Sequence, residues 1–176
     1  MFSPFSYEMP TRVEFGRGTA LKVADEVRRL GCSRVLLLSD NGVKNAGLLD
    51  GVRNTLHSGS VPCELFLDIE PNPKDRNVAA AAQAARAFKA DCLVAVGGGS
   101  PIDCAKATAI VAAAGGTARD YEGRFKSDIP PLPIIAIPTT AGTASELTFG
   151  AVITDTEAKF KFTVKSTQLA PKVALA

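Results

Sequence analysis

Three consecutive glycines, Gly97, Gly98 and Gly99, follow a short apolar segment and precede Ser100 and Pro101. Glycine has no Cβ atom, so a ligand can approach the backbone N–H groups of such a turn closely. Pro101 fits the first position of a helix and Ser100 the position that caps it, which predicts a helix start. Free N–H groups at the positive end of a helix dipole form a site for an anion such as a pyrophosphate. The pattern differs from GxGxxG, and a tight structural turn is the alternative interpretation.

Asp103 lies three residues after Ser100, which is the spacing of a capping box. A carboxylate at a helix start repels a diphosphate unless it caps the backbone or contacts a sugar or nicotinamide group. Asp103 is therefore a candidate cofactor contact. The alternative is a purely structural cap that pairs with Lys106 one turn later.

A second turn, rich in hydroxyl groups, contains Thr139, Thr140, Thr143 and Ser145. Hydroxyl groups can bond phosphate or ribose oxygens, so the threonines are candidate cofactor contacts. Thr143 and Glu146 repeat the capping-box spacing and predict one short helical turn. A capped loop without a ligand is the alternative.

Asp40 ends another apolar segment and precedes Asn41 and Gly42. A carboxylate at the end of a strand can accept hydrogen bonds from the ribose hydroxyls of adenosine. It disfavours a 2′-phosphate, because like charges ~4 Å apart repel by roughly 1 to 4 kcal/mol and about 1.4 kcal/mol is tenfold in affinity. The residue therefore favours NAD over NADP. A turn that serves only the bend is the alternative.

Strands and helices that alternate along the chain must position these turns. We expect strands at residues 11–15, 35–38, 63–67, 92–96, 133–137 and 173–175, and helices at residues 19–30, 46–56, 76–88 and 101–114. The first helix should bury one face formed by Leu21, Ala24, Val27 and Leu30. This alternation implies right-handed crossovers and a parallel sheet, and ligands of such sheets lie at the carboxyl ends of the strands. Residues 149–154 and 159–164 predict a hairpin. The fold class is thus α/β, a Rossmann-like parallel sheet flanked by helices with a small antiparallel hairpin, in one dinucleotide-binding domain over residues 1–176.

The composition excludes several classes of protein. The chain has 176 residues and 46% hydrophobic content, which suits one globular domain. The 20 basic residues are scattered among 18 acidic ones, so nucleic acid is not an expected partner. No apolar run reaches the ~18 residues of a membrane span, and Met1 to Pro10 lack a signal-peptide pattern, so we expect a cytoplasmic protein. Cys32, Cys63, Cys92 and Cys104 show no ligand spacing and should be buried or half-buried thiols.

The two turns and their flanking residues resemble motifs of the iron-containing (group III) alcohol dehydrogenase family. The motifs are GGGSPIDCAK at residues 97–106 and PTTAGTASE at residues 138–146, and the resemblance extends over essentially the whole chain. Glycerol dehydrogenases and dehydroquinate synthase share the fold, but the Ser100-Pro101 pair is closer to the alcohol dehydrogenase branch. One departure is Ala144, where the family usually has glycine. It matters only if the position requires a positive φ.

The resemblance implies the roles of individual residues. Gly98, Gly99 and Ser100 would hold the pyrophosphate of NAD, and Asp40 and Asn72 would lie near its adenosine. Other residues expected along the cofactor are Thr139, Thr140, Thr143, Thr148 and Lys161. Lys161 fits as a cation near the nicotinamide ribose, although a lysine on a hairpin is more often solvent-facing. The implied parent activity is reversible hydride transfer between a primary alcohol or aldehyde and NAD(P), with a metal as Lewis acid.

The resemblance also implies a homo-oligomer such as a dimer, and a second, all-helical domain that supplies ligands to iron or another divalent metal. This chain stops at Ala176 and has one histidine, His57, which we predict to be a surface residue. One imidazole cannot build such a metal site. We therefore expect a chain that binds NAD but no metal, holds no catalytic residue and is nearly inactive alone. The alternative is a non-catalytic nucleotide-binding or assembly module, and glycerol dehydrogenase or dehydroquinate synthase-like chemistry is less favoured.

Overall fold

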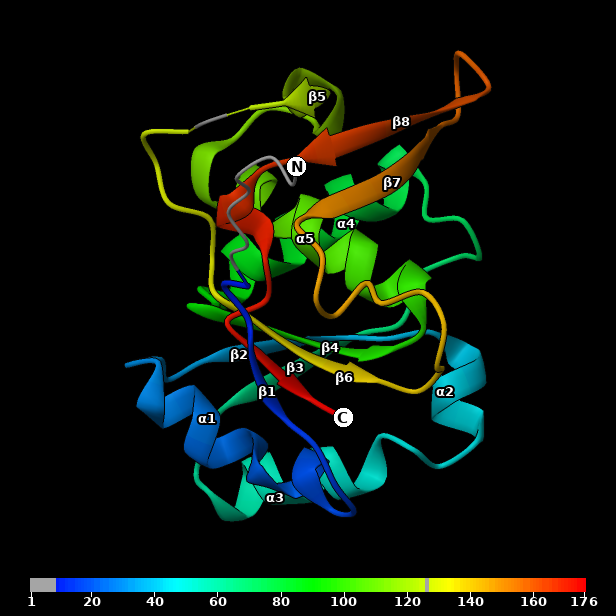
Figure 1. The fold of residues 1–176 in the computed structure, drawn as a ribbon. Helices are drawn as coiled ribbons and strands as arrows, with labels where there is room; N and C mark the ends of the chain where they lie inside the picture. The colour runs from blue at the N-terminus through cyan, green and yellow to red at the C-terminus, as the bar shows by residue number, and fades with distance from the viewer. Residues whose placement is uncertain (1–8, 126) are drawn as a thin grey trace, which may run out of the picture.

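The main sheet has six parallel strands in the order β1-β9-β6-β4-β2-β3 (Figure 1). The computed structural model describes residues 9–125 and 127–176; the opening residues 1–8, part of the segment predicted to lack a signal peptide, lie outside the described residues. The strands are β1 (Arg12–Glu14), β2 (Val35–Leu38), β3 (Cys63–Phe66), β4 (Cys92–Gly97), β6 (Ile134–Pro138) and β9 (Val173–Leu175). The predicted parallel α/β sheet is confirmed.

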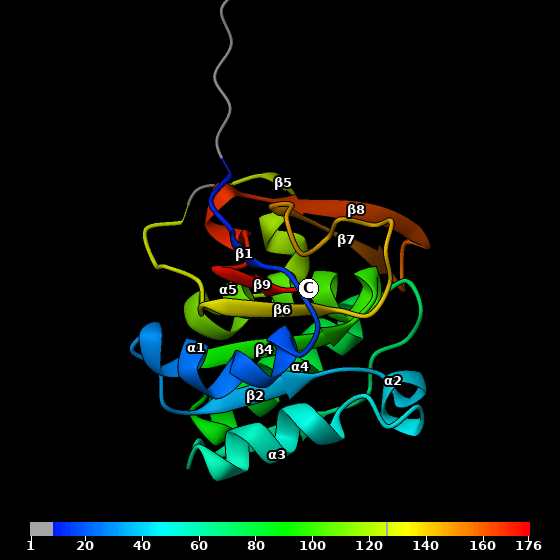
Figure 2. The ribbon, with the colours of Figure 1, turned by 60° about the horizontal axis from the view of Figure 1, so that its bottom comes forward.

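Helices cover both faces of this sheet (Figures 1 and 2). They are α1 (Val23–Arg29), α2 (Asn41–Asn45), α3 (Asp50–Ser58), α4 (Asp75–Phe88) and α5 (Gly99–Ala114), with short 3-10 turns η1 (Thr19–Lys22), η2 (Ala118–Tyr121) and η3 (Thr167–Leu169). Successive strand residues alternate between the two layers: Val35 and Leu37 join the core under α1 and α3, and Leu36 and Leu38 join the core under α4 and α5. Strands buried on both faces are therefore apolar at every position.

A smaller sheet lies beyond α5 and consists of β5 (Gly123–Arg124), β7 (Gly150–Asp155) and β8 (Phe160–Lys165) (Figure 1). The predicted antiparallel hairpin is confirmed as β7 and β8. Strand β5, which the sequence does not predict, pairs in parallel with β8, so the small sheet is mixed. Helix α5 packs against β4 on one side and β7 on the other, which explains why it is apolar almost all round.

Several local predictions are wrong. The turn predicted at Asn41 and Gly42 is helix α2, and the helix predicted for residues 46–56 begins only at Asp50 as α3. Leu21 is 54% exposed, because the first turn of the predicted helix is the 3-10 turn η1 with a different periodicity. Cys63 is exposed at the edge strand β3, whereas Cys92 and Cys104 are buried as predicted and Cys32 is half-buried.

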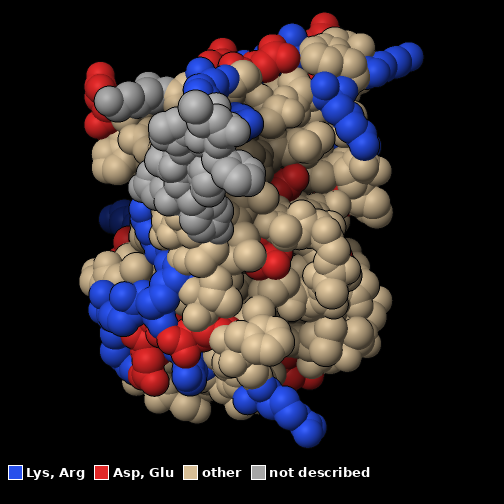
Figure 3. All heavy atoms as spheres, in the orientation of Figure 1, with Lys and Arg blue, Asp and Glu red and all other residues tan. Residues whose placement is uncertain are grey.

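Charged side chains form ion pairs across the surface of α1. Arg29 and Arg12 contact Glu26, and Arg28 contacts Asp25. On the face shown in Figure 3, basic and acidic side chains are interspersed. None of the helices in the described parts of the chain is long and apolar enough to cross a membrane.

Candidate cofactor-binding site

The three turns singled out by the sequence lie together at the carboxyl ends of β2, β4 and β6. These strands are neighbours, and Gly97 at the end of β4 pairs with Pro138 at the end of β6. The N–H of Thr139 donates to the carbonyl oxygen of Gly97 at 3.0 Å. Next to them, the hydroxyl of Ser39 donates to the carbonyl oxygen of Val96 at 2.7 Å. The predicted gathering of the turns is confirmed.

The glycine turn has no room for a side chain at Gly97 and little room at Gly98 and Gly99. Gly97 has a φ of +150°, and a Cβ atom there would lie 2.5 Å from Cγ of Pro101. A Cβ atom on Gly98 would lie 3.1 Å from Oγ1 of Thr140, and one on Gly99 would lie 3.2 Å from Cγ2 of Thr143. The absence of side chains thus lets the two predicted turns approach one another.

Helix α5 begins at Gly99, two residues earlier than predicted, and Gly98 caps it without a side-chain bond. Ser100 is therefore not the cap; it lies in the first turn, and its Oγ accepts a hydrogen bond from the N–H of Asn72 at 3.2 Å. The first N–H groups of a helix have no acceptor within the helix. Among residues 9–125 and 127–176, no acceptor outside the helix is found for the N–H groups of Gly99 and Ser100.

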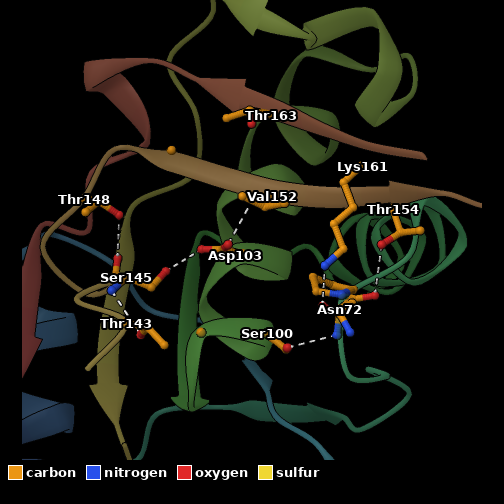
Figure 4. Close-up of a pocket in the computed structure, with 13 residues that line it drawn as sticks. Asn72, Ser100, Asp103, Thr143, Ser145, Thr148, Val152, Thr154, Lys161 and Thr163 are labelled. Carbon is orange, nitrogen blue, oxygen red and sulfur yellow. Dashed lines mark hydrogen bonds between the residues drawn. The ribbon is translucent and has the colours of Figure 1, made fainter. Parts of the chain in front are cut away.

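Two open cavities meet at this helix start and share Gly99 and Ser100. The first, of about 490 Å³, lies between α5 and the hairpin; Figure 4 shows its lining residues. The second, of about 720 Å³, lies at the ends of β2 and β3. Asn72, Asp103, Thr143, Thr148 and Lys161 line the first cavity, and Asp40, Gly98, Thr139 and Thr140 line the second. Both have volumes typical of ligand pockets.

The second cavity is acidic at the end of β2. Asp40 caps α2, because its Oδ1 accepts from the N–H of Val43 at 2.9 Å, so the residue starts a helix instead of serving a bend. Asp68 and Glu70 line the same cavity. Glu70 is paired with Arg76 at 2.8 Å, which leaves the carboxylates of Asp40 and Asp68 without a basic partner among the described residues.

Lys161 reaches across the first cavity from β8. Its Nζ donates to Oδ1 of Asn72 at 2.7 Å (Figure 4). Asn72 has a φ of +55°, and its N–H points to Ser100. Asn72 therefore lines the same cavity as Lys161. The side chain of Lys161 is exposed, yet it contacts a residue at the helix start.

Asp103 does not cap the helix. Its Oδ1 accepts a hydrogen bond from the hydroxyl of Ser145, and its Oδ2 accepts from the N–H of Val152 at 3.0 Å (Figure 4). The alternative pairing with Lys106 is present at 3.7 Å. The capping prediction is wrong because α5 begins at Gly99 with Gly98 as its cap, so Asp103 lies five residues after the cap rather than three.

Lys106 is completely buried, and sequence analysis missed its role beyond that pairing. Its Nζ donates to Oγ of Ser145 at 3.2 Å, to Oγ1 of Thr148 at 3.0 Å and to the carbonyl oxygen of Gly150 at 2.9 Å. Burial lowers the pKa of Lys106 to about 8, against the opposing effect of Asp103 and Glu146. A signal was present, since lysine is almost never buried without partners and here it stands inside an apolar helix.

The second turn contains one hydrogen-bonded turn, as predicted, but no longer helix, because the N–H groups of Leu147 and Thr148 both donate to the carbonyl oxygen of Ala144, at 3.0 and 3.2 Å. Oγ1 of Thr143 accepts from the N–H of Ser145 at 3.3 Å, and Glu146 does not complete a capping box. Ala144 has a φ of +51°, a left-handed conformation that costs alanine about 1–2 kcal/mol. The departure from glycine at this position therefore carries a strain that the sequence alone did not show.

Comparison with protein families matches residues 10–176 to the family described as iron-containing alcohol dehydrogenase. This chain belongs to that family. It is 38% identical over 159 residues to alcohol dehydrogenase 4 of Schizosaccharomyces pombe, with 90% of this chain and 38% of the relative covered.

Two solved structures of similar proteins have the same fold. A crystal structure of 1,3-propanediol oxidoreductase superposes with a TM-score of 0.93 at 37% identity, over 98% of this chain and 45% of that one. A sulfoacetaldehyde reductase from Bifidobacterium kashiwanohense, solved in complex with NAD+, gives a TM-score of 0.87 at 30% identity, over 98% and 46% of the two chains. This chain thus spans less than half the length of these relatives.

The described residues do not fit the metal of the family name. No group of three or more histidine, cysteine, aspartate or glutamate side chains within residues 9–125 and 127–176 could hold a metal ion. His57 is exposed near the end of α3, as predicted.

Proposed function

We propose that this chain is the NAD-binding part of an iron-dependent alcohol dehydrogenase. The observation that carries the proposal is the start of α5, where the N–H groups of Gly99 and Ser100 face two cavities that meet between them. A dinucleotide has the same layout, with two nucleoside halves on either side of a pyrophosphate. Backbone N–H groups and the helix dipole favour the pyrophosphate.

The two halves of the cofactor are assigned by the chemistry of the cavities. The carboxylate of Asp40 suits the ribose hydroxyls of adenosine and disfavours a 2′-phosphate, so the adenosine lies in the second cavity and NAD is preferred over NADP. The nicotinamide half then lies in the first cavity, beside Thr148 and Lys161. Bound NAD supplies the hydride acceptor of the parent reaction, the oxidation of a primary alcohol to an aldehyde. The chain's own residues bind and orient it.

Calorimetry tests the proposal. The 176-residue chain should bind NAD, and a dehydrogenase assay with NAD, a primary alcohol and added ferrous iron should show no turnover by this chain alone. Absence of NAD binding to the folded chain would remove the basis of the proposal. Metal-dependent turnover by the same sample would contradict the assignment of this chain as only the cofactor-binding part.

A further inference from the structure

Two residues of α5 hold one wall of the first cavity. The wall is the segment from Ser145 to Val152, which connects the second turn to β7. Lys106 bonds this wall at three positions and Asp103 at two, as described above. The two helix residues therefore fix the distance between α5 and the wall.

An ammonium group has three N–H donors and no acceptor. Lys106 uses all three, on Ser145, Thr148 and Gly150. Ser145 in turn donates its own proton to Asp103. The two carboxylates that face Lys106 are Asp103 and Glu146, and both favour its charged form.

Thr148 differs from Ser145 in where its proton can go. Its oxygen accepts from Lys106 at 3.0 Å, and the one acceptor found for its proton among the described residues is the carbonyl oxygen of Ser145, at a long 3.5 Å. The side chain is exposed and lines the cavity. While Lys106 is charged, Thr148 is consequently available as a donor to a ligand in that cavity.

We infer that Lys106 is a positioning residue that sets the Thr148 hydroxyl as a hydrogen-bond donor to the nicotinamide half of the cofactor. A neutral lysine has a lone pair and can accept the Thr148 proton, which turns the proton away from the cavity. When Lys106 is charged, the Thr148 hydroxyl can donate to the cofactor. When Lys106 is neutral, the hydroxyl donates to Lys106 instead. This inference rests on the proposed function, because it takes the first cavity as the nicotinamide side.

The test compares the affinities of NADH and ADP, since ADP lacks the nicotinamide riboside. ADP also carries a terminal phosphate charge that NADH lacks, so the change in the ratio between variants, and not its value, reports the first cavity. Lys106→Met removes the donors at similar length, and it should lower the ratio about tenfold with little change in ADP binding, because the Thr148 hydroxyl is no longer held in place by a hydrogen bond from a charged group. Thr148→Val should lower the ratio similarly. In the double variant the two effects should not add, because both act on the same hydroxyl.

The control is Thr108→Val, a buried change on the same helix, and the one side-chain hydrogen bond found for Thr108 among the described residues is with Cys104. It should leave the ratio unchanged. If Lys106→Met does not fold, the pH series on the wild type replaces it. Because burial brings the pKa of Lys106 to about 8, the ratio should fall several-fold from pH 7 to pH 9 in the wild type and stay constant in Thr148→Val.

The outcomes separate two kinds of failure. If NADH and ADP both bind and the ratio is insensitive to pH and to Lys106→Met, the inference on Lys106 is wrong while the proposed function stands. Additive effects in the double variant would also contradict it. If neither ligand binds the folded wild type, the proposed function itself fails.

Discussion

Strand β4 begins in a turn whose polar groups are engaged and ends in a turn whose N–H groups have no acceptor outside α5 among the described residues. At the amino end, the carboxylate of Asp91 accepts from both N–H groups of Ser33 and Arg34 and from the Ser33 hydroxyl, at 2.8 to 3.0 Å. At the carboxyl end, the N–H groups of Gly99 and Ser100 face the two cavities. One end of the strand thus stabilises the fold, and the other leaves N–H donors free to bind a ligand.

The largest effect should come from a substitution in the turn at the amino end of β4. Asp91→Asn replaces an acceptor of several N–H bonds with an amide that donates, so it should lower the free energy of unfolding by about 2 kcal/mol. NAD affinity should not change. Denaturant unfolding and calorimetry measure the two quantities, with Asp25→Asn on the surface of α1 as control. A loss of NAD affinity in Asp91→Asn would show that the amino end of β4 also contributes to NAD binding.

The same variant should show a defined pH dependence. Burial acts to raise the pKa of Asp91, but hydrogen bonds from Arg34 and Ser33 outweigh it and lower the pKa below its ordinary value. A group with a lowered folded-state pKa contributes stability above its unfolded pKa, and the contribution is lost as pH falls through the folded pKa. The stability difference between wild type and Asp91→Asn should therefore be constant from pH 5 to 7 and shrink progressively at more acidic pH.

The converse substitution is made in the glycine turn at the carboxyl end of β4. In Gly99→Ala, a Cβ atom enters the point shared by both cavities, 3.2 Å from Thr143, and NAD affinity should fall at least about tenfold. Stability should hold, because alanine favours a helix more than glycine does. Gly51→Ala is a matched control, since it is a helical glycine with a neighbour at the same 3.2 Å, Leu21, outside both cavities. Equal NAD binding by Gly99→Ala and wild type would contradict the account.

A substitution with a smaller effect tests whether the adenosine lies in the second, acidic cavity. Asp40→Asn removes the charge but keeps a good cap for α2. The ratio of NADP to NAD affinity should rise roughly fivefold, because a repulsion of about 1 kcal/mol is removed. Competition binding measures it, with Asp25→Asn as the control. An unchanged ratio would place the adenosine elsewhere.

The smallest effect concerns the turn that faces the glycines. Ala144→Gly should stabilise the chain by about 0.5–1 kcal/mol, because relief of the left-handed strain exceeds the entropy lost by glycine. Ala141→Gly, in the same turn but without a positive φ, should destabilise it slightly. Thermal unfolding distinguishes the two. A destabilised Ala144→Gly would show that the turn is not strained.

The sequence predicted the parallel sheet and the open turn at the carboxyl end of β4, because both follow from local patterns. The apolar run at residues 35–38 requires burial on both faces, and a turn of three glycines after such a strand indicates close backbone approach. Both features depend on residues adjacent in the chain. Asp40, Gly97 and Thr139 then lie close together at the carboxyl ends of neighbouring strands, because the sheet is parallel.

The side-chain network could not be predicted because its partners are far apart in sequence. Asp103 satisfies the local spacing of a capping box, but its partner Ser145 is 42 residues away. The spacing rule took Ser100 as the cap, whereas α5 starts at Gly99, so Asp103 is left to accept from Ser145 and Val152. The positive φ of Ala144 is also not evident from local sequence, because alanine does not favour that conformation.

The amide resonances of the labelled chain show whether the open turn after β4 holds the pyrophosphate of NAD. With saturating NAD, the amide signals of Gly98, Gly99 and Ser100 should shift, while those of Ser33 and Arg34, bound to Asp91, should stay in place. If NAD binds and the glycine and serine amides do not move, the pyrophosphate lies elsewhere and its assignment to this turn is contradicted.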